Sequence, residues 1–222
     1  EQSWQACYIY DIAVTPSVVY IAGAFGAVQG EPQRFVAALD ATTGKLMDWN
    51  PEPNCYVYAL EVVGSTLYVG GNFQMIAGKE RTCLAAFATN THELKSWDPL
   101  LGDASYSSVN AMAVSDATLY VGGLFNSADT QPRASIAAFD TNTGQLRSWN
   151  PGVNGHVLAM EVHHSTLYVG GNFSEAGGQN RWGIAAFHLP TGNVTPWNPK
   201  AWDANMRGGG RIYSLACEGS TV

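Results

Sequence analysis

The sequence is poor in charged residues, and its positive charges are scattered. Only 13% of the 222 residues are charged, and the formal net charge is −7. Proteins that bind nucleic acid need clustered lysine and arginine to displace counterions, whereas the 11 lysine and arginine residues here form no cluster. The composition therefore argues strongly against nucleic-acid binding, and it disfavours binding to an anionic membrane surface for the same reason.

Long apolar runs are also missing, although hydrophobic residues make up 46% of the chain. A membrane-spanning helix needs about 18 or more consecutive apolar residues, so we expect no membrane insertion. The first residues, Glu1-Gln2-Ser3-Trp4, lack the basic and then apolar order of a retained signal peptide. A leader that has already been removed would leave the same sequence.

The four cysteines are too few for a disulfide scaffold, and none forms a C-x-x-C pair. These spacings argue against zinc sites and redox motifs, and we expect no metal or cofactor. Cys7 and Cys55 are 48 residues apart, each just before an apolar run. The sequence leaves two alternatives for this pair, a disulfide bond or two buried free thiols.

One short phrase occurs four times and is the strongest signal in the chain. Its tyrosines, Tyr20, Tyr68, Tyr120 and Tyr168, are 48, 52 and 48 residues apart. The copies cover residues 18–25, 66–73, 118–125 and 166–173. A period near 50 with short apolar runs predicts an array of small antiparallel sheets.

The second repeat shows the expected order of strands. Its apolar runs predict strands at 57–63, 66–73 and 83–88, with a polar loop at 74–81, and a fourth strand at 94–97 follows the turn at 89–93. Pro99 ends the last of them, because proline cannot donate to a continuing ladder. The glycine of the Thr-Gly turns supplies a positive φ, and His92 takes its place in the second copy. The doubled glycines Gly70-Gly71 and Gly122-Gly123 allow a neighbouring sheet or a large ring to approach closely.

We therefore predict an all-β fold, a β-propeller of four-stranded antiparallel blades. A β-helix or stacked solenoid is the rival. Residues 1–222 form a single propeller region, with repeats at roughly 5–51, 52–99, 100–151 and 152–199 and a partial fifth repeat at 200–222. Four repeats plus a partial one suggest a piece of a larger propeller, or a partial repeat that pairs with another subunit.

The repeat resembles a known family. Residues 167–173 (Leu-Tyr-Val-Gly-Gly-Asn-Phe), 136–140 (Ile-Ala-Ala-Phe-Asp) and 149–151 (Trp-Asn-Pro) look like the delta-sixty class of bacterial β-propeller repeats. They are also similar to the repeats of the Rax2-like fungal surface proteins. The resemblance implies an extracellular or cell-surface propeller, and it brings no catalytic motif that could be transferred to this chain.

A second resemblance supplies the enzyme alternative. Segments 38–44 and 138–144, followed by Trp49 and Trp149, look like the tryptophan-docking motif of quinoprotein dehydrogenases. In that family the tryptophan follows the glycine by four residues, whereas here it follows by five. Since strand side chains alternate, the indole lands on the other side of the strand. The adjacent cysteine pair of many quinoproteins is absent as well.

Several polar residues recur at fixed places in the repeats. An arginine precedes each third strand (Arg34, Arg81, Arg133 and Arg181). Recurrence in every copy favours a structural tie within each repeat over an anion site. Glu61 and Glu161 share one place on the innermost strand and would face the central channel of a propeller. We expect structural pairing with a repeat arginine, and a general acid and base pair is the alternative.

Variable loops are where propellers usually bind their partners. Trp202, Tyr106 and Arg207 lie in the least repetitive linkers and are our candidate ligand-binding residues, suited to a carbohydrate or a peptide. Asn193 and Asn172 begin N-glycosylation triplets. We expect a non-catalytic structural or binding module at the cell surface whose partners include the segments or subunits that complete the propeller. A lectin and a quinoprotein enzyme are the alternatives.

Overall fold

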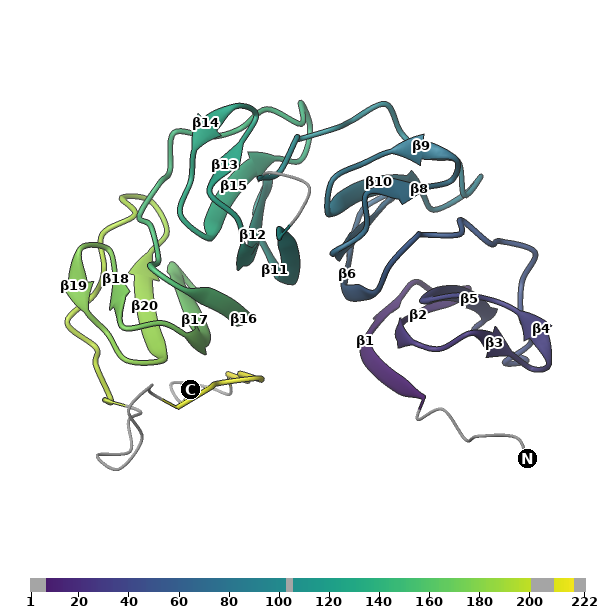
Figure 1. The fold of residues 1–222 in the computed structure, drawn as a ribbon, viewed down its shortest axis with the longest axis horizontal. Helices are drawn as coiled ribbons and strands as arrows, with labels where there is room; N and C mark the ends of the chain where they lie inside the picture. Colours follow the sequence, from purple (N-terminus) through teal and green to yellow (C-terminus); the bar gives the residue numbers. More distant parts are fainter. Residues whose placement is uncertain (1–6, 103–105, 201–209, 218–222) are drawn as a thin grey trace. The chain divides into compact units, whose positions relative to one another are not determined.

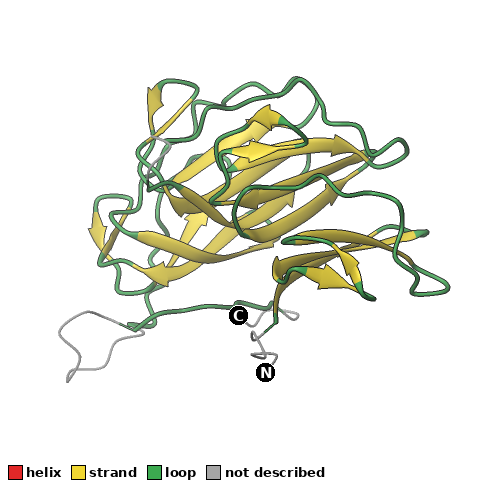
Figure 2. Ribbon diagram, turned by 45° about the vertical axis from the view of Figure 1, so that its right-hand side comes forward, coloured by secondary structure: helices red, strands yellow, loops and turns green. Residues whose placement is uncertain are grey.

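The computed structural model describes residues 7–102, 106–200 and 210–217. These residues form strands, turns and loops without a helix, as Figure 2 shows. In the same ranges there is accordingly no helix long and apolar enough to cross a membrane. The chain divides into two compact units, Glu1–Asp98 (unit 1) and Pro99–Val222 (unit 2), and each holds two of the predicted repeats.

Each repeat forms a three-stranded antiparallel sheet with its second strand in the middle (Figure 1). In unit 1 the sheets are β1 (Tyr8–Val14), β2 (Val18–Ala24) and β5 (Val36–Asp40), then β6 (Val57–Val63), β7 (Thr66–Gly71) and β10 (Leu84–Ala88). In unit 2 they are β11 (Ser108–Ser115), β12 (Thr118–Leu124) and β15 (Ile136–Asp140), then β16 (His156–His163), β17 (Thr166–Asn172) and β20 (Ile184–His188). The repeats predicted from the sequence are thus confirmed as repeated antiparallel sheets.

The fourth strand is shorter than predicted. In the second repeat it is a single bridge between Phe87 and Leu94, flanked by backbone bonds from Ala88 N to Glu93 O and from Lys95 N to Ala86 O. The other repeats have the same arrangement. Asp98 and Pro99 follow so soon that the ladder has no room to lengthen.

The polar loop predicted between the second and third strands contains a small hairpin in every repeat. The hairpins are β3–β4 (Ala27–Val28, Glu31–Pro32), β8–β9 (Met75–Ile76, Lys79–Glu80), β13–β14 (Ser127–Ala128, Gln131–Pro132) and β18–β19 (Glu175–Ala176, Gln179–Asn180). Two-residue strands are too short to show the alternation of polar and apolar residues that identifies a strand in a sequence.

Aromatic side chains join the two repeats of each unit. In unit 1 the buried Trp49 packs edge-on against Tyr20 of its own repeat and Phe87 of the next, at ring distances of 5.6 and 5.4 Å. In unit 2 Trp149 contacts Tyr120 and Phe187 in the same way, at 5.0 and 6.1 Å. The prediction that tryptophans and tyrosines stack the repeats is confirmed within each unit.

The doubled glycines serve two different approaches. A Cβ on the first, Gly122, would lie 2.4 Å from Val157 and 2.5 Å from Met160 of the next repeat. A Cβ on the second, Gly123, would lie 1.9 Å from the backbone oxygen of Ser108 in its own sheet. The first glycine therefore admits a neighbouring repeat, as predicted, and the second admits the start of the adjoining inner strand.

Residues 210–217 pack on the last repeat as an inner strand would. A Cβ on Gly170 would lie 2.5 Å from Ile212 and 3.5 Å from Leu215, which repeats the contacts of Val157 and Met160 at Gly122. Ile212 N also donates to Gly171 O at 3.2 Å. This segment occupies the place of the first strand of a fifth repeat.

Candidate functional site

The first strand of each repeat, which we call its inner strand (β1, β6, β11 and β16), carries a β-bulge close to its start. The pairing register shifts by one residue between Ile9 and Asp11, and at the same place in the other three repeats. The extra residues are Tyr10, Tyr58, Asn110 and Leu158. A bulge re-aims the side chain of its extra residue and is frequent beside functional sites.

In unit 1 the starts of β1 and β6 bring four tyrosines together, Tyr8, Tyr10, Tyr56 and Tyr58, which we call the tyrosine cluster. The rings of Tyr8 and Tyr10 are parallel, with centroids 6.4 Å apart. Tyr10 lies 5.5 Å from Tyr58, and Tyr56 lies 6.3 Å from Tyr58. Phe35 supports the cluster from the side, 5.0 Å from Tyr56.

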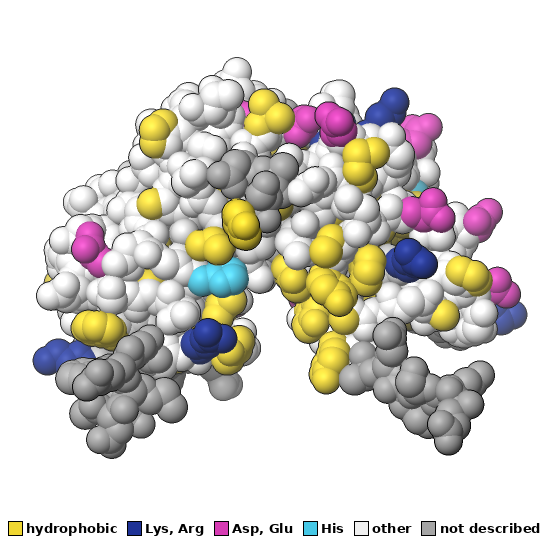
Figure 3. All heavy atoms as spheres, viewed as in Figure 1, with side chains coloured by type: hydrophobic (Ala, Val, Ile, Leu, Met, Phe, Trp, Pro, Cys, Tyr) yellow, Lys and Arg dark blue, Asp and Glu magenta, His cyan; other side chains and the backbone are white. Residues whose placement is uncertain are grey.

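The tyrosine cluster is open to solvent. Tyr8, Tyr10 and Tyr56 expose 56%, 47% and 41% of their surface. Figure 3 shows hydrophobic side chains gathered over β1 and β6 in this unit. Burial raises the pKa of Tyr58 to about 12, so its hydroxyl stays protonated at neutral pH. The cluster therefore presents three exposed aromatic rings, each with a hydroxyl group.

In unit 2 the equivalent positions carry a polar cluster of Ser108, Asn110 and His156. Ser108 Oγ donates to Asn110 Oδ1 at 2.6 Å, and His156 Nε2 lies 2.9 Å from the same oxygen and 3.3 Å from Ser108 Oγ. Burial, and to a smaller extent the charge of Arg211, lowers the pKa of His156. The imidazole is thus held neutral in a hydrogen-bonded network.

This lowered pKa predicts a pH dependence of stability. The unfolded chain has a histidine pKa of about 6.5, so below that pH the unfolded state binds more protons than the folded state. The contribution of neutral His156 to the free energy of unfolding is complete above about pH 6.5. It is lost as the pH falls toward the lowered pKa of His156 in the folded state. The free energy of unfolding of His156→Gln should fall less between pH 7 and pH 5 than that of the unmodified chain, measured by urea denaturation. Parallel curves for the two proteins would contradict the assignment.

The sequence alone did not identify these two clusters, although it contains a signal for them. The repeats agree closely, yet this position holds tyrosine in both repeats of unit 1 (Tyr8 and Tyr56) and other residue types in unit 2 (Ser108 and His156). The bulge residues change between the units in the same way. Of the predicted ligand-binding residues, Tyr106 is 84% exposed and lies two residues before Ser108. Trp202 and Arg207 lie outside the described residues.

The two carboxylates Glu61 and Glu161 are half-buried on their inner strands, opposite Tyr68 and Tyr168. Glu61 belongs to unit 1 and Glu161 to unit 2. Burial, followed by the charge of Glu161, raises the pKa of Cys217, so Glu161 lies beside the segment 210–217. Across the described residues, no group of three or more His, Cys, Asp and Glu side chains could hold a metal ion.

The repeat arginines act as structural ties. Arg133 donates to the carbonyl oxygens of Pro132 and Arg147 at 2.8 and 2.9 Å. Arg181 donates to the equivalent carbonyl oxygens, and Arg81 adds an ion pair with Asp98 at 3.5 Å.

The first repeat departs from the expected arginine pattern. Its tie is the buried Gln33, which donates to Trp49 O at 2.7 Å, and Arg34 is exposed. The prediction that placed Arg34 in this series is wrong by one residue.

The cysteines and the glycosylation triplets have simple surroundings. Cys7 and Cys55 are both free thiols in the structure, the first exposed and the second half-buried. Burial, with the nearby Cys55, raises the pKa of the Cys83 thiol to about 12. Asn193 is exposed after a turn, whereas Asn172 is half-buried at the end of β17.

Solved structures share this fold. The extracellular domain of the one-component system BT4673 from B. thetaiotaomicron is 12% identical with a TM-score of 0.61, over 100% of this chain and 26% of that one. The WD40 repeats of RRP9 are 11% identical with a TM-score of 0.58, over 87% and 52% of the two chains. The computationally designed Ika4 protein is 18% identical with a TM-score of 0.52, over 85% and 94%. This chain thus spans about a quarter of the BT4673 domain and about half of the RRP9 chain.

Comparison with curated proteins finds no match. The family described as the Rax2 C-terminal beta propeller domain matches residues 84–206, which is more than half of the chain. The predicted β-propeller fold is confirmed by this match and by the solved structures, while the resemblance to delta-sixty repeats stays a prediction. The chain therefore belongs to the Rax2 C-terminal beta propeller domain family.

Proposed function

We propose that this chain is a non-catalytic binding module of an extracellular or cell-surface propeller and recognises a protein or glycan ligand. The observation that supports the proposal is the variation at the starts of the inner strands. Residues that stack the repeats recur in every copy, whereas the bulge residues are Tyr10 and Tyr58 in unit 1 and Asn110 and Leu158 in unit 2. A surface that varies on a constant scaffold is typical of a binding site.

The tyrosine cluster is the part of this surface best suited to contact a ligand. Tyrosines supply a large contact area at a low cost in conformational entropy, and they are enriched among the residues that dominate binding. Tyr8, Tyr10 and Tyr56 are already oriented by ring contacts with each other or with Tyr58. A ligand would therefore meet a surface that is ordered before it binds.

Loss of the exposed rings should abolish most of the binding. We expect Tyr10→Ala/Tyr56→Ala to weaken binding by about thirtyfold or more, since even one such anchor contributes about 2 kcal/mol or more. Glycan arrays and pull-downs from cell-surface extracts, performed with the 222-residue chain, would measure the change. Trp182→Ala is the matched control, because Trp182 is 40% exposed and lies outside the cluster. Identical profiles for the double variant and the unmodified chain would sink the proposal.

The surface location is part of the same proposal. It is supported by the resemblance to Rax2-like surface proteins and by the exposure of Asn193, which a glycan could occupy without disturbing the core. The binding role is proposed to include no catalysis, because the residues with chemistry of their own, such as Arg133 and Arg181, form hydrogen bonds within their repeats.

The proposal also includes a structural partner for the first repeat. Ile9, Ile12 and Val14 of β1 are 49%, 57% and 63% exposed. The equivalents of Ile9 and Ile12 in the next repeat, Val57 and Leu60, are 0% and 5% exposed because they pack on the first repeat. The partner that fits this face is another repeat of the same kind, from the same polypeptide or another subunit.

A further inference from the structure

The second repeat of each unit has a different residue at one position of the turn after its third strand. The turn after the third strand carries His92 in unit 1 and Gly192 in unit 2, both with positive φ, 58° and 72°. In unit 1 the imidazole fills the space beside the tryptophan that joins the repeats. Its Nε2 lies 3.0 Å from Tyr20 Oη, and its ring lies 5.9 Å from that of Tyr20 and 5.5 Å from that of Trp49.

The walls around this imidazole are repeated in unit 2. The ring centroids of Tyr20 and Trp49 lie 5.6 Å apart, with 80° between the ring planes. Those of Tyr120 and Trp149 lie 5.0 Å apart, with 75° between the planes. Gly192 brings no side chain to the space beside them. Unit 2 therefore keeps the aromatic walls of a histidine-binding arrangement without the histidine.

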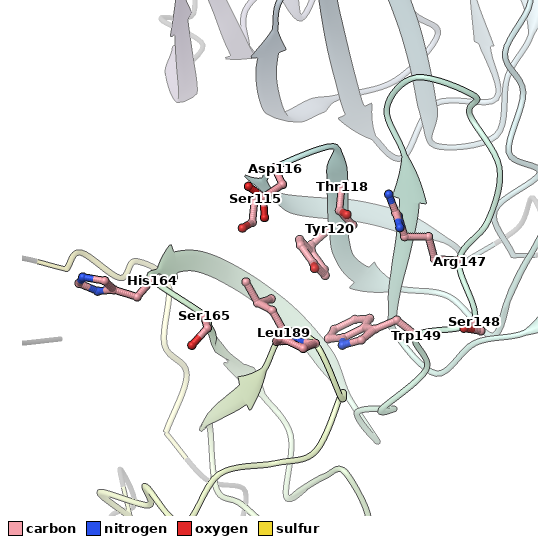
Figure 4. A pocket seen from close by; sticks show the side chains of 11 residues that line it. Ser115, Asp116, Thr118, Tyr120, Arg147, Ser148, Trp149, His164, Ser165 and Leu189 are labelled. Atoms are coloured by element: carbon pink, nitrogen blue, oxygen red, sulfur yellow. The ribbon is translucent and has the colours of Figure 1, made fainter.

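The space beside these walls is a cleft that opens to solvent. A hollow of about 420 Å³ is lined by Tyr120, Trp149 and Leu189, with Ser115 and His164 at its edge. A second hollow of about 680 Å³ is lined by Gly192 and Asn193 and shares Ser148, Trp149 and Pro190 with the first. In Figure 4 Tyr120, Leu189 and Trp149 lie around one space.

A buried polar atom also lacks a partner here. Trp149 Nε1 is buried and has no hydrogen-bond acceptor among the described residues. A Cβ at position 192 would lie 3.2 Å from it, so a group seated beside Gly192 would lie close to this donor. An unmade hydrogen bond of a buried N–H group is costly, which favours a ligand that supplies an acceptor.

We propose that the cleft beside Tyr120 and Trp149 binds an imidazole ring, as presented by a histidine side chain of a partner polypeptide or by a small imidazole compound. The ring takes the place that His92 fills in unit 1 and exchanges a hydrogen bond with Tyr120 Oη. Ser115 ends β11 and His164 follows β16, whereas the polar cluster lies at the starts of both strands. The cleft is therefore separate from the proposed ligand surface.

Titration of the 222-residue chain with a capped histidine peptide tests the proposal. The indole N–H signal of Trp149, assigned in an NMR spectrum with Trp149→Phe, should shift in a saturable way. Gly192→His should weaken this binding by tenfold or more, since the new side chain occupies the cleft. His92 shows that a histidine is accepted at this place in the turn. His92→Gly is the matched opposite change, and it should create a second site that shifts the indole signal of Trp49.

Three other measurements keep the proposal falsifiable if Gly192→His fails to fold. Tyr120→Phe should weaken binding by about threefold to tenfold, the effect of one hydrogen bond. Histamine distinguishes the source of the ring. If histamine binds and the capped histidine peptide does not, the site is assigned to a small compound. A capped phenylalanine peptide should not compete. The proposal is overturned if Trp149 does not respond to either imidazole probe, or if phenylalanine binds equally well.

Discussion

Gly171→Ala is expected to destabilise unit 2 by about 3 kcal/mol or more, because overpacking against a backbone that cannot move is costly. The new Cβ would lie 2.0 Å from His156 O and 3.0 Å from Val157 Cα. Neither atom can rotate away, since both belong to the bulged start of β16, which pairs with β17. The midpoint of urea denaturation should therefore fall sharply.

Two other glycines provide controls for this substitution. Gly26→Ala should stay within about 0.5 kcal/mol, because it adds a methyl group to a surface position with no heavy atom within 4 Å. Gly170→Ala should cost less than Gly171→Ala, because its Cβ would meet the side chain of Ile212. Alanine already holds this place in the first repeat, as Ala22. Equal effects of Gly171→Ala and Gly26→Ala would show that the close approach of β16 has no energetic weight.

Arg133→Ala should destabilise the third repeat by about 1.5 to 3 kcal/mol, the range for hydrogen bonds that involve a charged group. Arg133 is only 6% exposed. Its guanidinium group donates to the carbonyl oxygens of Pro132 and of Arg147, which follows the single bridge at Leu146. Lysine should not restore the stability, because an ammonium group lacks the planar fork that reaches two oxygens. Thermal or urea unfolding would measure both variants.

Arg34→Ala is the matched control for the arginine tie. Arg34 also precedes a third strand, but it is exposed, and its effect on the free energy of unfolding should stay within about 0.5 kcal/mol. Gln33→Ala should instead reproduce part of the Arg133→Ala loss, since Gln33 holds the carbonyl oxygen of Trp49. A larger loss from Arg34→Ala than from Gln33→Ala would refute the shift by one residue.

The repeating pattern was sufficient to predict the strands, their order and the stacking tryptophans. These features depend on local periodicity, and each of the four copies repeats the same signal. The small hairpins such as β8–β9 were missed because their strands are only two residues long. The fourth strand was predicted over 94–97, whereas its ladder is the single bridge at Leu94.

The candidate sites could be predicted less well because each depends on residues of two repeats. Tyr10 and Tyr58 are 48 residues apart in sequence, yet their rings contact. The bulge that places them adds one residue to the strand, and a shift of one residue reverses the side that every later side chain faces. Counting along a strand therefore gave no warning of the tyrosine cluster.

The amino-acid sequence by itself determined that this protein is an array of antiparallel sheets, because strand and turn signals are local and were repeated four times. The tertiary structure alone decided which side chains meet between adjacent sheets. His92 and Gly192 occupy equivalent turns of two repeats. Only the packing of His92 on Tyr20 and Trp49 shows that it fills a space which Gly192 leaves open. Contacts of this kind depend on the distance between surfaces of different repeats, which no local pattern encodes.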